Sequence, residues 1–374
     1  MPHVKFGYYL YCYTDLANPE NAKSGVEKKI ISQIKTLNAY GVKCKFVYCK
    51  APNNLLKKII SCIPFFSDGI SWPPIEQLNN PSFIYIRRPA VVGKELIDFL
   101  AAFKNKYPDA MVLYEIPSYP YDKEMTGLLS LALVKDRIYR KKLSDNVDYI
   151  VDLSGENRIF GIPTIQITNG IDLSMYAEKK PVNLNNEINI LSVAFFERWH
   201  GIDRFIVGMR DYVQSHGQLI HLHLVGAGTA LSELKKKVAD YGLSDFVTFY
   251  GVLEGESLSE IYNKCSLAID CLGIHRRGKG QKSSSLKSRE YMARGMPFIG
   301  SSPIDVFENE YVDFFLKMPE SEEPINIEAV VQFHNELYAK YSQSELIAKI
   351  REFANLHISM DMAMKSVIDI LSDR

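Results

Sequence analysis

Residues 221–253, HLHLVGAGTALSELKKKVADYGLSDFVTFYGVL, contain the pattern that decides the fold. An apolar run ends on Gly226-Ala227-Gly228, a helical pattern follows, and a second apolar run ends at Gly251. Strand, helix and strand in this order predict parallel strands joined by a covering helix. A glycine pair after a strand is by itself usually only a tight turn, so the rest of the chain must indicate the function.

The same alternation of short apolar runs and longer amphipathic runs continues through the chain. In the first half we expect a helix at 25–41 and strands at 4–11, 43–49, 83–87, 110–115 and 149–154. In the second half we expect helices at 202–217, 229–243 and 257–265, and strands at 188–194, 220–226, 246–251, 267–272 and 297–301. The predicted fold class is therefore α/β, with one doubly wound sheet in each half.

The composition changes to Asn, Lys and Pro without periodicity around 172–188, where we place a linker. We predict a first domain at 1–171, a second at 189–355, and a last helix at 356–374 that could cross back to the first domain. A chain of 374 residues can bury two such cores. Two facing sheets of this kind create a cleft at the C-terminal ends of their strands, where open α/β folds bind ligands.

Charge and composition exclude several classes of function. Lys and Arg together number 44, as do Asp and Glu, so the basic excess typical of nucleic-acid binding is absent. We expect a cytoplasmic protein, because the N-terminus runs directly into a strand pattern and no apolar stretch approaches the length of a membrane span. The six cysteines include no C-x-x-C pair and are expected to be reduced thiols, and we expect no bound metal.

The segment KSSSLKSREYMARGMPFIGSS, residues 282–302, predicts a helix over 286–294 that follows three serines. Ser284 or Ser285 is its expected N-cap, and Gly295 ends it. A helix N-terminus preceded by small residues offers backbone N–H groups to a phosphate, and Glu290 could accept hydrogen bonds from ribose hydroxyls. Alternatively, Glu290 forms an ordinary surface ion pair with Lys287 or Arg294.

The order of the motifs resembles the donor-binding half of the retaining glycosyltransferases of family 4. That family has the GT-B fold, in which two Rossmann-like domains face each other. The matching positions are Asn169 to Asp172, His200-Gly201, Gly226 to Gly228, Gly251, and Glu290 with Ala293, Gly295 and Pro297. In the first half, SGVEKKIISQI resembles the glycine-rich loop of the family and places Gly25 near the donor phosphates or the acceptor.

The resemblance also shows where this chain departs from the family. The first carboxylate of the Glu-x7-Glu motif falls at Lys282, and the Arg and Lys that neutralise the diphosphate align with Phe195 and His200. Arg198, His200 and Lys287 are candidate replacements. The predicted nucleotide and diphosphate site comprises Gly25, Arg198, His200, Gly226, Gly228, Val252, Ser283, Ser284, Ser285, Leu286, Lys287 and Glu290.

The histidine that the family carries in its first domain is missing, and Glu115 lies at the end of a predicted strand, where a catalytic or acceptor-positioning group belongs. Glu115 and Lys282 are the predicted catalytic residues, although Glu115 could instead be a helix-capping or loop carboxylate. Arg87 and Arg88 either hold an anionic acceptor or form surface salt bridges. The basic loop 275–279 is either a solvated loop or a segment that closes over a diphosphate.

The resemblance implies transfer of a sugar from a nucleoside diphosphate sugar to a saccharide or lipid-linked saccharide, with retention, without a metal or cofactor, in polysaccharide biosynthesis such as that of a bacterial capsule. The amphipathic stretches 53–72 and 127–142 either face the core or touch the inner face of the cell membrane. Two other functions stay open: a nucleotide-sugar epimerase or phosphorylase of the same fold, and a degenerate protein that binds a nucleotide sugar or glycan without turnover.

Overall fold

In the computed structural model, residues 5–122, 129–184, 187–214, 219–277, 284–308 and 310–372 are described. The chain forms two compact units, one of residues 1–170 with 360–374 and the other of residues 171–359. The segment at 172–188 that we expected to be a linker groups with the second unit, because Ile171 and Tyr176 are buried in the core of that unit. The last helix groups with the first unit.

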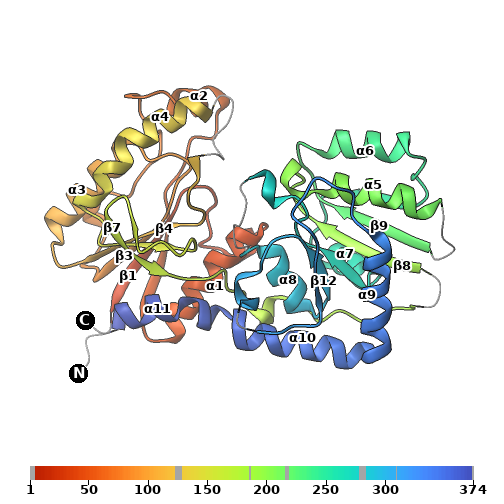
Figure 1. Cartoon of the computed structure of the whole chain (residues 1–374). Coiled ribbons are helices and arrows are strands. Elements are labelled where there is room, and N and C mark those ends of the chain that lie inside the picture. The colour runs from red at the N-terminus through yellow and green to blue at the C-terminus, as the bar shows by residue number, and fades with distance from the viewer. Residues whose placement is uncertain are drawn as a thin grey trace. The chain divides into compact units, whose positions relative to one another are not determined.

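The first unit, in which Figure 1 labels β1, β3, β4 and β7, has a seven-stranded sheet in the order β2-β1-β3-β4-β5-β7-β6. All neighbouring strands are parallel except β6 and β7. The strands are β1 (Phe6–Tyr11), β2 (Lys43–Tyr48), β3 (Phe83–Arg87), β4 (Met111–Ile116), β5 (Tyr149–Asp152), β6 (Arg158–Ile159) and β7 (Ile162–Gln166). The strand order reverses between β1 and β3, the position at which doubly wound sheets bind ligands.

Helices cover both faces of this sheet because successive strand residues point to opposite faces. The helices are α1 (Gly25–Ala39), α2 (Leu55–Ser61), α3 (Lys94–Lys106), α4 (Leu129–Tyr139) and α11 (Met360–Ser372). Tyr8 and Leu10 of β1 belong to the core that α3 and α4 cover. Tyr9 and Tyr11 belong to the core that α1 and α11 cover, so the C-terminal helix completes the first unit.

The second unit has a six-stranded parallel sheet in the order β10-β9-β8-β11-β12-β13. Its strands are β8 (Glu187–Val193), β9 (Leu219–Val225), β10 (Val247–Gly251), β11 (Leu267–Ile269), β12 (Phe298–Gly300) and β13 (Phe315–Lys317). Counted within the unit, this is the order 3-2-1-4-5-6 of a dinucleotide-binding sheet, which reverses between β8 and β11.

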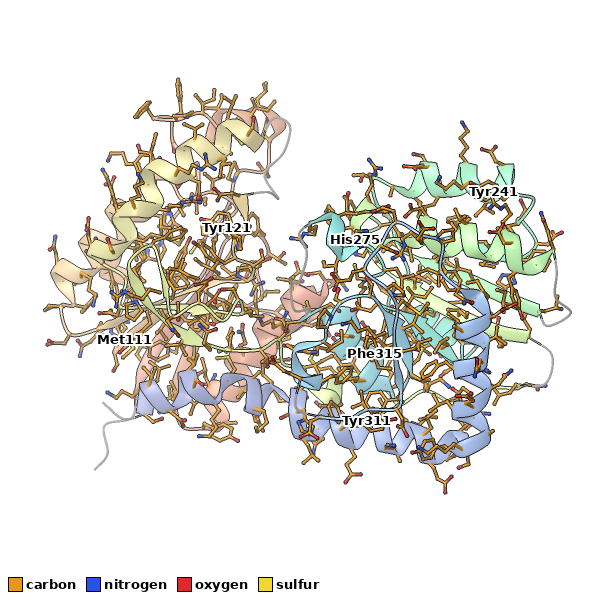
Figure 2. The ribbon with its side chains drawn as sticks, viewed as in Figure 1. Met111, Tyr121, Tyr241, His275, Tyr311 and Phe315 are labelled. Atoms are coloured by element: carbon orange, nitrogen blue, oxygen red, sulfur yellow. The ribbon has the colours of Figure 1, made fainter. Side chains whose placement is uncertain are left out.

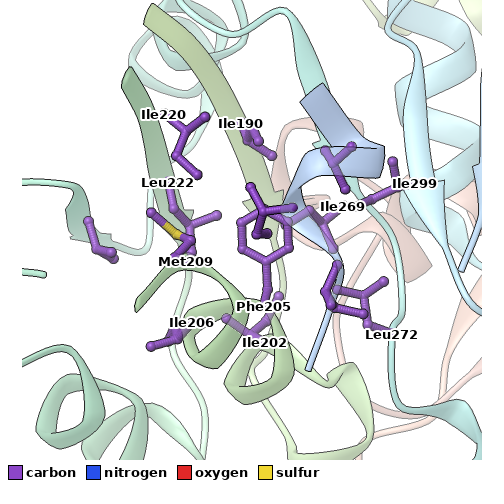
Figure 3. Close-up of a cluster of buried hydrophobic side chains, with 14 of the residues drawn as sticks. Ile190, Ile202, Phe205, Ile206, Met209, Ile220, Leu222, Ile269, Leu272 and Ile299 are labelled. Carbon is purple, nitrogen blue, oxygen red and sulfur yellow. The ribbon is translucent and has the colours of Figure 1, made fainter. Parts of the chain in front are cut away.

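Two groups of helices cover the second sheet, and they are α5 (Ile202–Val213), α6 (Leu231–Asp240), α7 (Gly255–Tyr262), α8 (Leu286–Arg294), α9 (Ile327–Lys340) and α10 (Gln343–Ile358). Figure 3 shows one core, in which Phe205 and Met209 of α5 lie against Ile190, Leu222 and Ile269 of the strands. The other core is shared by α7, α8 and α10. Both sheets and the covering helices agree with the α/β class that the sequence predicts.

Candidate functional site

The ends of β8 and β11 meet where the second sheet reverses its strand order, and the candidate site is built there. Asp270 follows β11 and is fully buried beside the first turn of α8. Ser285 caps α8 by accepting a hydrogen bond from the Ser288 N–H at 3.0 Å, and its hydroxyl donates to Asp270 Oδ1 at 2.7 Å. Lys287 Nζ lies 3.5 Å from the same oxygen. One carboxylate thus holds the helix cap and a lysine together.

The loop after β8 brings His200 to the same place. His200 ends the short 3₁₀ helix Arg198–His200, and its Nδ1 accepts a hydrogen bond from the Glu197 N–H at 2.9 Å. A nitrogen that accepts cannot carry the proton of a neutral ring, so the proton lies on Nε2. Burial, together with the nearby charges of Lys287 and Arg277, lowers the pKa of His200 to about 2. His200 is therefore a neutral hydrogen-bond donor beside two cations.

The glycine turn after β9 packs on the loop after β8. A Cβ atom on Gly226 would lie 1.8 Å from the Ala194 carbonyl oxygen, and one on Gly228 would lie 2.1 Å from the Phe196 carbonyl oxygen. Both glycines also have positive φ, 136° and 149°. The backbones approach so closely that only glycine fits at positions 226 and 228. The contact with the nucleotide that we expected of these glycines stays a prediction.

Glu290 lies one turn inside α8 and is half-buried. Its Oε1 accepts from Arg294 Nε at 3.1 Å, as the alternative of an ion pair predicts. The Arg294 guanidinium stacks on the ring of Tyr262, 4.2 Å from its centroid. Burial and the Glu290 charge raise the pKa values of Tyr176 and Tyr262, which shows that both hydroxyls lie near this carboxylate. The ion pair with Arg294 orients the Glu290 carboxylate. The predicted role of Glu290 as an acceptor for ribose hydroxyls stays a prediction.

The remaining candidates of the second unit differ in their surroundings. Arg198 and Val252 are exposed, and Ser284 accepts a hydrogen bond from the buried Arg289. Lys282 and Ser283 lie outside the described residues, so the catalytic role of Lys282 and the phosphate contact of Ser283 stay predictions. Leu286 begins α8.

The described start of the basic loop is held in place by acidic side chains. Arg276 Nη1 lies 2.8 Å from Asp203 Oδ1, and its Nη2 lies 2.6 Å from Glu322 Oε2. His275, labelled in Figure 2, lies 2.6 Å from Glu322. Arg276 is ion-paired, and His275 is hydrogen-bonded, within the second unit.

In the first unit, Glu115 is fully buried at the end of β4, and four side chains donate hydrogen bonds to it at 3.1 Å or less. The donors are Arg87 Nη1 at 2.6 Å, the Tyr85 hydroxyl at 2.7 Å, Lys29 Nζ at 3.0 Å and Gln33 Nε2 at 3.1 Å. Burial acts to raise the pKa of Glu115, but Lys29, Arg87 and the Tyr85 hydrogen bond lower it to about 2. Glu115 is therefore ionised and holds these four side chains together. Its predicted catalytic role stays a prediction.

The other candidates of the first unit are also engaged within it. Gly25 is the first residue of α1, where Ser24 and Glu27 form a capping box. Arg87 is bound to Glu115, and the Arg88 guanidinium lies 3.5 Å from the centroid of the Tyr121 ring, which Figure 2 labels. Both arginines are largely buried rather than surface residues. Their position at the end of β3 leaves the predicted acceptor role open.

Several residues with buried polar contacts were not identified from the sequence. Asp270 is the single charged residue of the apolar run LAIDCL, and this isolated charge could have identified it as a candidate site residue. Lys29 also donates to Asn169 Oδ1 at 2.7 Å, a pairing across 140 residues that no local pattern predicts. Arg289, fully buried on α8, donates to Asp305 at 2.7 Å and was hidden among other charged residues of the helix.

Comparison with protein families identifies the domain in which this site lies. Residues 176–323 match the model of the family described as glycosyl transferases group 1. The second unit carries a group 1 glycosyltransferase domain. The chain is accordingly a glycosyltransferase, as its sequence predicted. A search of curated proteins gave no match.

Solved structures support the fold over the whole chain. A crystal structure of HepE from Anabaena, in complex with UDP and glucose, matches with a TM-score of 0.61 and 12% identity over 99% of this chain and 100% of that one. Sucrose-phosphate synthase from Thermosynechococcus elongatus matches with a TM-score of 0.62 and 16% identity over 98% and 99% of the two chains. A glycosyltransferase from Rickettsia africae matches with a TM-score of 0.61 and 12% identity over 99% and 98%. The glycosyltransferase domain therefore belongs to a chain with the GT-B fold.

Proposed function

We propose that this glycosyltransferase moves a sugar from a nucleoside diphosphate sugar to a hydroxyl of a saccharide or lipid-linked saccharide. The observation that carries the proposal is the convergence of α8, His200 and Lys287 where the second sheet reverses its order. Open α/β sheets bind nucleotides at this position. The UDP bound by the Anabaena structure supports the same ligand class.

The proposed site can stabilise the charge that the reaction produces. Breaking the bond between the anomeric carbon and its oxygen leaves negative charge on the diphosphate, which fixed dipoles and cations stabilise. The first N–H groups of α8 and the Nε2–H of His200 offer hydrogen bonds, and Lys287 offers a positive charge. Lys287 is held by Asp270 in this structure, so a bound diphosphate would compete with that carboxylate.

Glu290 is the proposed ribose acceptor. Its Oε1 is engaged by Arg294, and Oε2 is the oxygen that we assign to ribose hydroxyls. Because Arg294 is fixed on the ring of Tyr262, the carboxylate is held in one orientation before the ligand arrives. Pre-organisation of this kind reduces the entropy cost of binding.

The finer parts of the proposal follow from the family resemblance. They are retention of anomeric configuration, transfer without a divalent metal, a role in polysaccharide biosynthesis such as that of a capsule, and a location in the cytoplasm. The N–H groups of α8 with Lys287 and His200 supply the charge stabilisation that a metal gives elsewhere, which supports the metal-independent mechanism.

The test is incubation of the protein with a panel of UDP-, GDP-, TDP- and ADP-sugars, with free nucleotide measured over hours. We expect slow hydrolysis of one donor, a loss of most of that activity in Lys287→Ala, and no change in Lys236→Ala, an exposed lysine on α6. Conversion of the sugar without nucleotide release would favour an epimerase. Binding without any release from any donor would favour a degenerate protein.

A further inference from the structure

We infer that the face formed by α2, the turn after it and α4 is a docking surface for a bilayer that contains anionic phospholipid. This inference goes beyond the proposed transfer reaction and does not depend on it. It rests on side chains of the first unit alone.

Helix α4 exposes apolar side chains and buries charged ones. Leu131, Val134 and Ile138 form one stripe of the helix and are exposed, Leu131 to 51%. Its buried side contains Lys135 and Asp136, which are both fully buried, together with Ala132 and Tyr139. An amphipathic helix of a globular protein normally buries its apolar side, so the outer stripe of α4 is suited to an apolar environment.

The buried charges explain why this orientation is fixed. Lys135 Nζ donates to the carbonyl oxygens of Ser61 at 2.9 Å and Phe66 at 2.7 Å. Asp136 accepts from the Val92 N–H at 2.9 Å and from the Tyr121 hydroxyl at 2.8 Å. Rotation of α4 would break these hydrogen bonds and leave the buried Val92 N–H and Tyr121 hydroxyl without their acceptor, at a cost in free energy. The apolar stripe therefore has to stay outside.

The Lys135 bonds also join α4 to α2 and to the turn after it, and Figure 1 shows the two helices side by side. Leu56, Ile59 and Ile60 are exposed on α2 at helical spacing, Leu56 to 68%. The turn adds Phe65 and Phe66, of which Phe65 is 78% exposed. Phe65 has φ 70°, a left-handed conformation that is costly for a bulky residue, and it presents the ring outward.

The lysines around this apolar face indicate an anionic partner. Residues 50–67 contain three lysines and no Asp or Glu, and Lys57 is exposed on α2. Lys141 and Lys142 are exposed just after α4. Apolar side chains bordered by lysines fit a leaflet with anionic headgroups. A symmetric dimer through the same face would instead bring these lysines toward their copies, which is unfavourable. Within the described residues, no helix is long and apolar enough to cross a membrane.

The test is sedimentation of the whole protein with vesicles of phosphatidylcholine that contain about a quarter phosphatidylglycerol, at low and moderate salt. We expect binding to these vesicles and little to pure phosphatidylcholine. The double variant Val134→Gln, Ile138→Gln should bind roughly tenfold more weakly, and Lys141→Ala, Lys142→Ala should lose the preference for anionic lipid. The control is Leu356→Gln, an exposed leucine on α10.

Circular dichroism checks that each variant melts as the wild type does, so that lost binding is not lost folding. Vesicle binding that the double glutamine variant leaves unchanged would overturn the inference, as would no binding to either vesicle. A wild-type dimer in sedimentation velocity that the same variant turns into a monomer would assign the face to a second copy and also overturn it. None of these readouts uses a sugar donor, so a failed donor assay would not affect them.

Discussion

Replacing Glu115 by glutamine should destabilise the first unit strongly. The carboxylate accepts hydrogen bonds from Arg87 at 2.6 Å and from Lys29 at 3.0 Å, and all three side chains are buried. Two positive charges share one negative charge in this network. Glu115→Gln keeps the size of the side chain but removes the negative charge that both cations share.

The magnitude follows from the pKa of the carboxyl group. The network lowers it from an ordinary 4.5 to about 2, and this difference corresponds to about 3 kcal/mol of stabilisation of the ionised form. Loss of one partner of a buried ion pair typically costs about 3 to 5 kcal/mol, in agreement. For a unit of this size, about 3 kcal/mol lowers the melting temperature by roughly 6 to 12 °C.

The sign of the pH dependence gives a second test. Because the pKa is lower in the folded state, the contribution of Glu115 is complete above the unfolded pKa of about 4.5 and is lost as the pH falls toward about 2. Glutamine does not titrate. The stability difference between the wild type and Glu115→Gln should therefore be largest near neutral pH and shrink from about pH 5 downward.

The assay is thermal unfolding by circular dichroism from neutral to acidic pH, with Glu76→Gln, an exposed carboxylate of the same unit, as control. Melting of Glu115→Gln within about 2 °C of the wild type at neutral pH would refute the reasoning, as would a difference that does not shrink with acid. A variant of wild-type stability that lost turnover would instead support the catalytic role predicted from the sequence.

Three further predictions concern the second unit and the reaction. His200→Ala should weaken binding of a nucleoside diphosphate roughly tenfold in calorimetry, and wild-type binding should not strengthen through this residue between about pH 8 and 5, because burial and Lys287 hold its pKa at about 2. Gly228→Ala should lose several times more stability in urea than Gly242→Ala, since the added Cβ meets the Phe196 carbonyl in the first case and nothing within 4 Å in the second. EDTA should leave donor hydrolysis unchanged, and a loss that Mg²⁺ restores would contradict the metal-independent proposal.

Local patterns were sufficient for the helix at the centre of the site. The sequence predicts a helix over 286–294 that begins after serine and ends at Gly295, and α8 has these bounds. Ser285 caps it, and Gly295 has φ 77°, which the absence of a side chain permits. Such features can be predicted from the sequence because the N-cap, the helix and the glycine that ends it lie within about a dozen residues of one another.

Hydrogen bonds between residues that are far apart in the sequence could not be predicted from it. The four residues that donate to Glu115 lie between 28 and 86 positions away, on one strand and one helix, so neither spacing nor composition connects them. Burial decides the character of such a carboxylate, and burial follows from the fold rather than from neighbours in the sequence. The stretch 172–188, expected to be a linker, groups with the second unit, and its Tyr176 is buried in the core of that unit within an otherwise polar sequence.

The central claim is that the start of α8 binds a nucleoside diphosphate, and calorimetric or thermal-shift titration with UDP, GDP, TDP, ADP and CMP tests it most directly. One diphosphate at about 100 times its Kd should stabilise the wild type by roughly 2.7 kcal/mol, and Glu290→Ala should lose most of that stabilisation. CMP should stabilise it much less, since it lacks the second phosphate. If no nucleotide stabilises the protein at millimolar concentration, α8, His200 and Lys287 do not form a donor site.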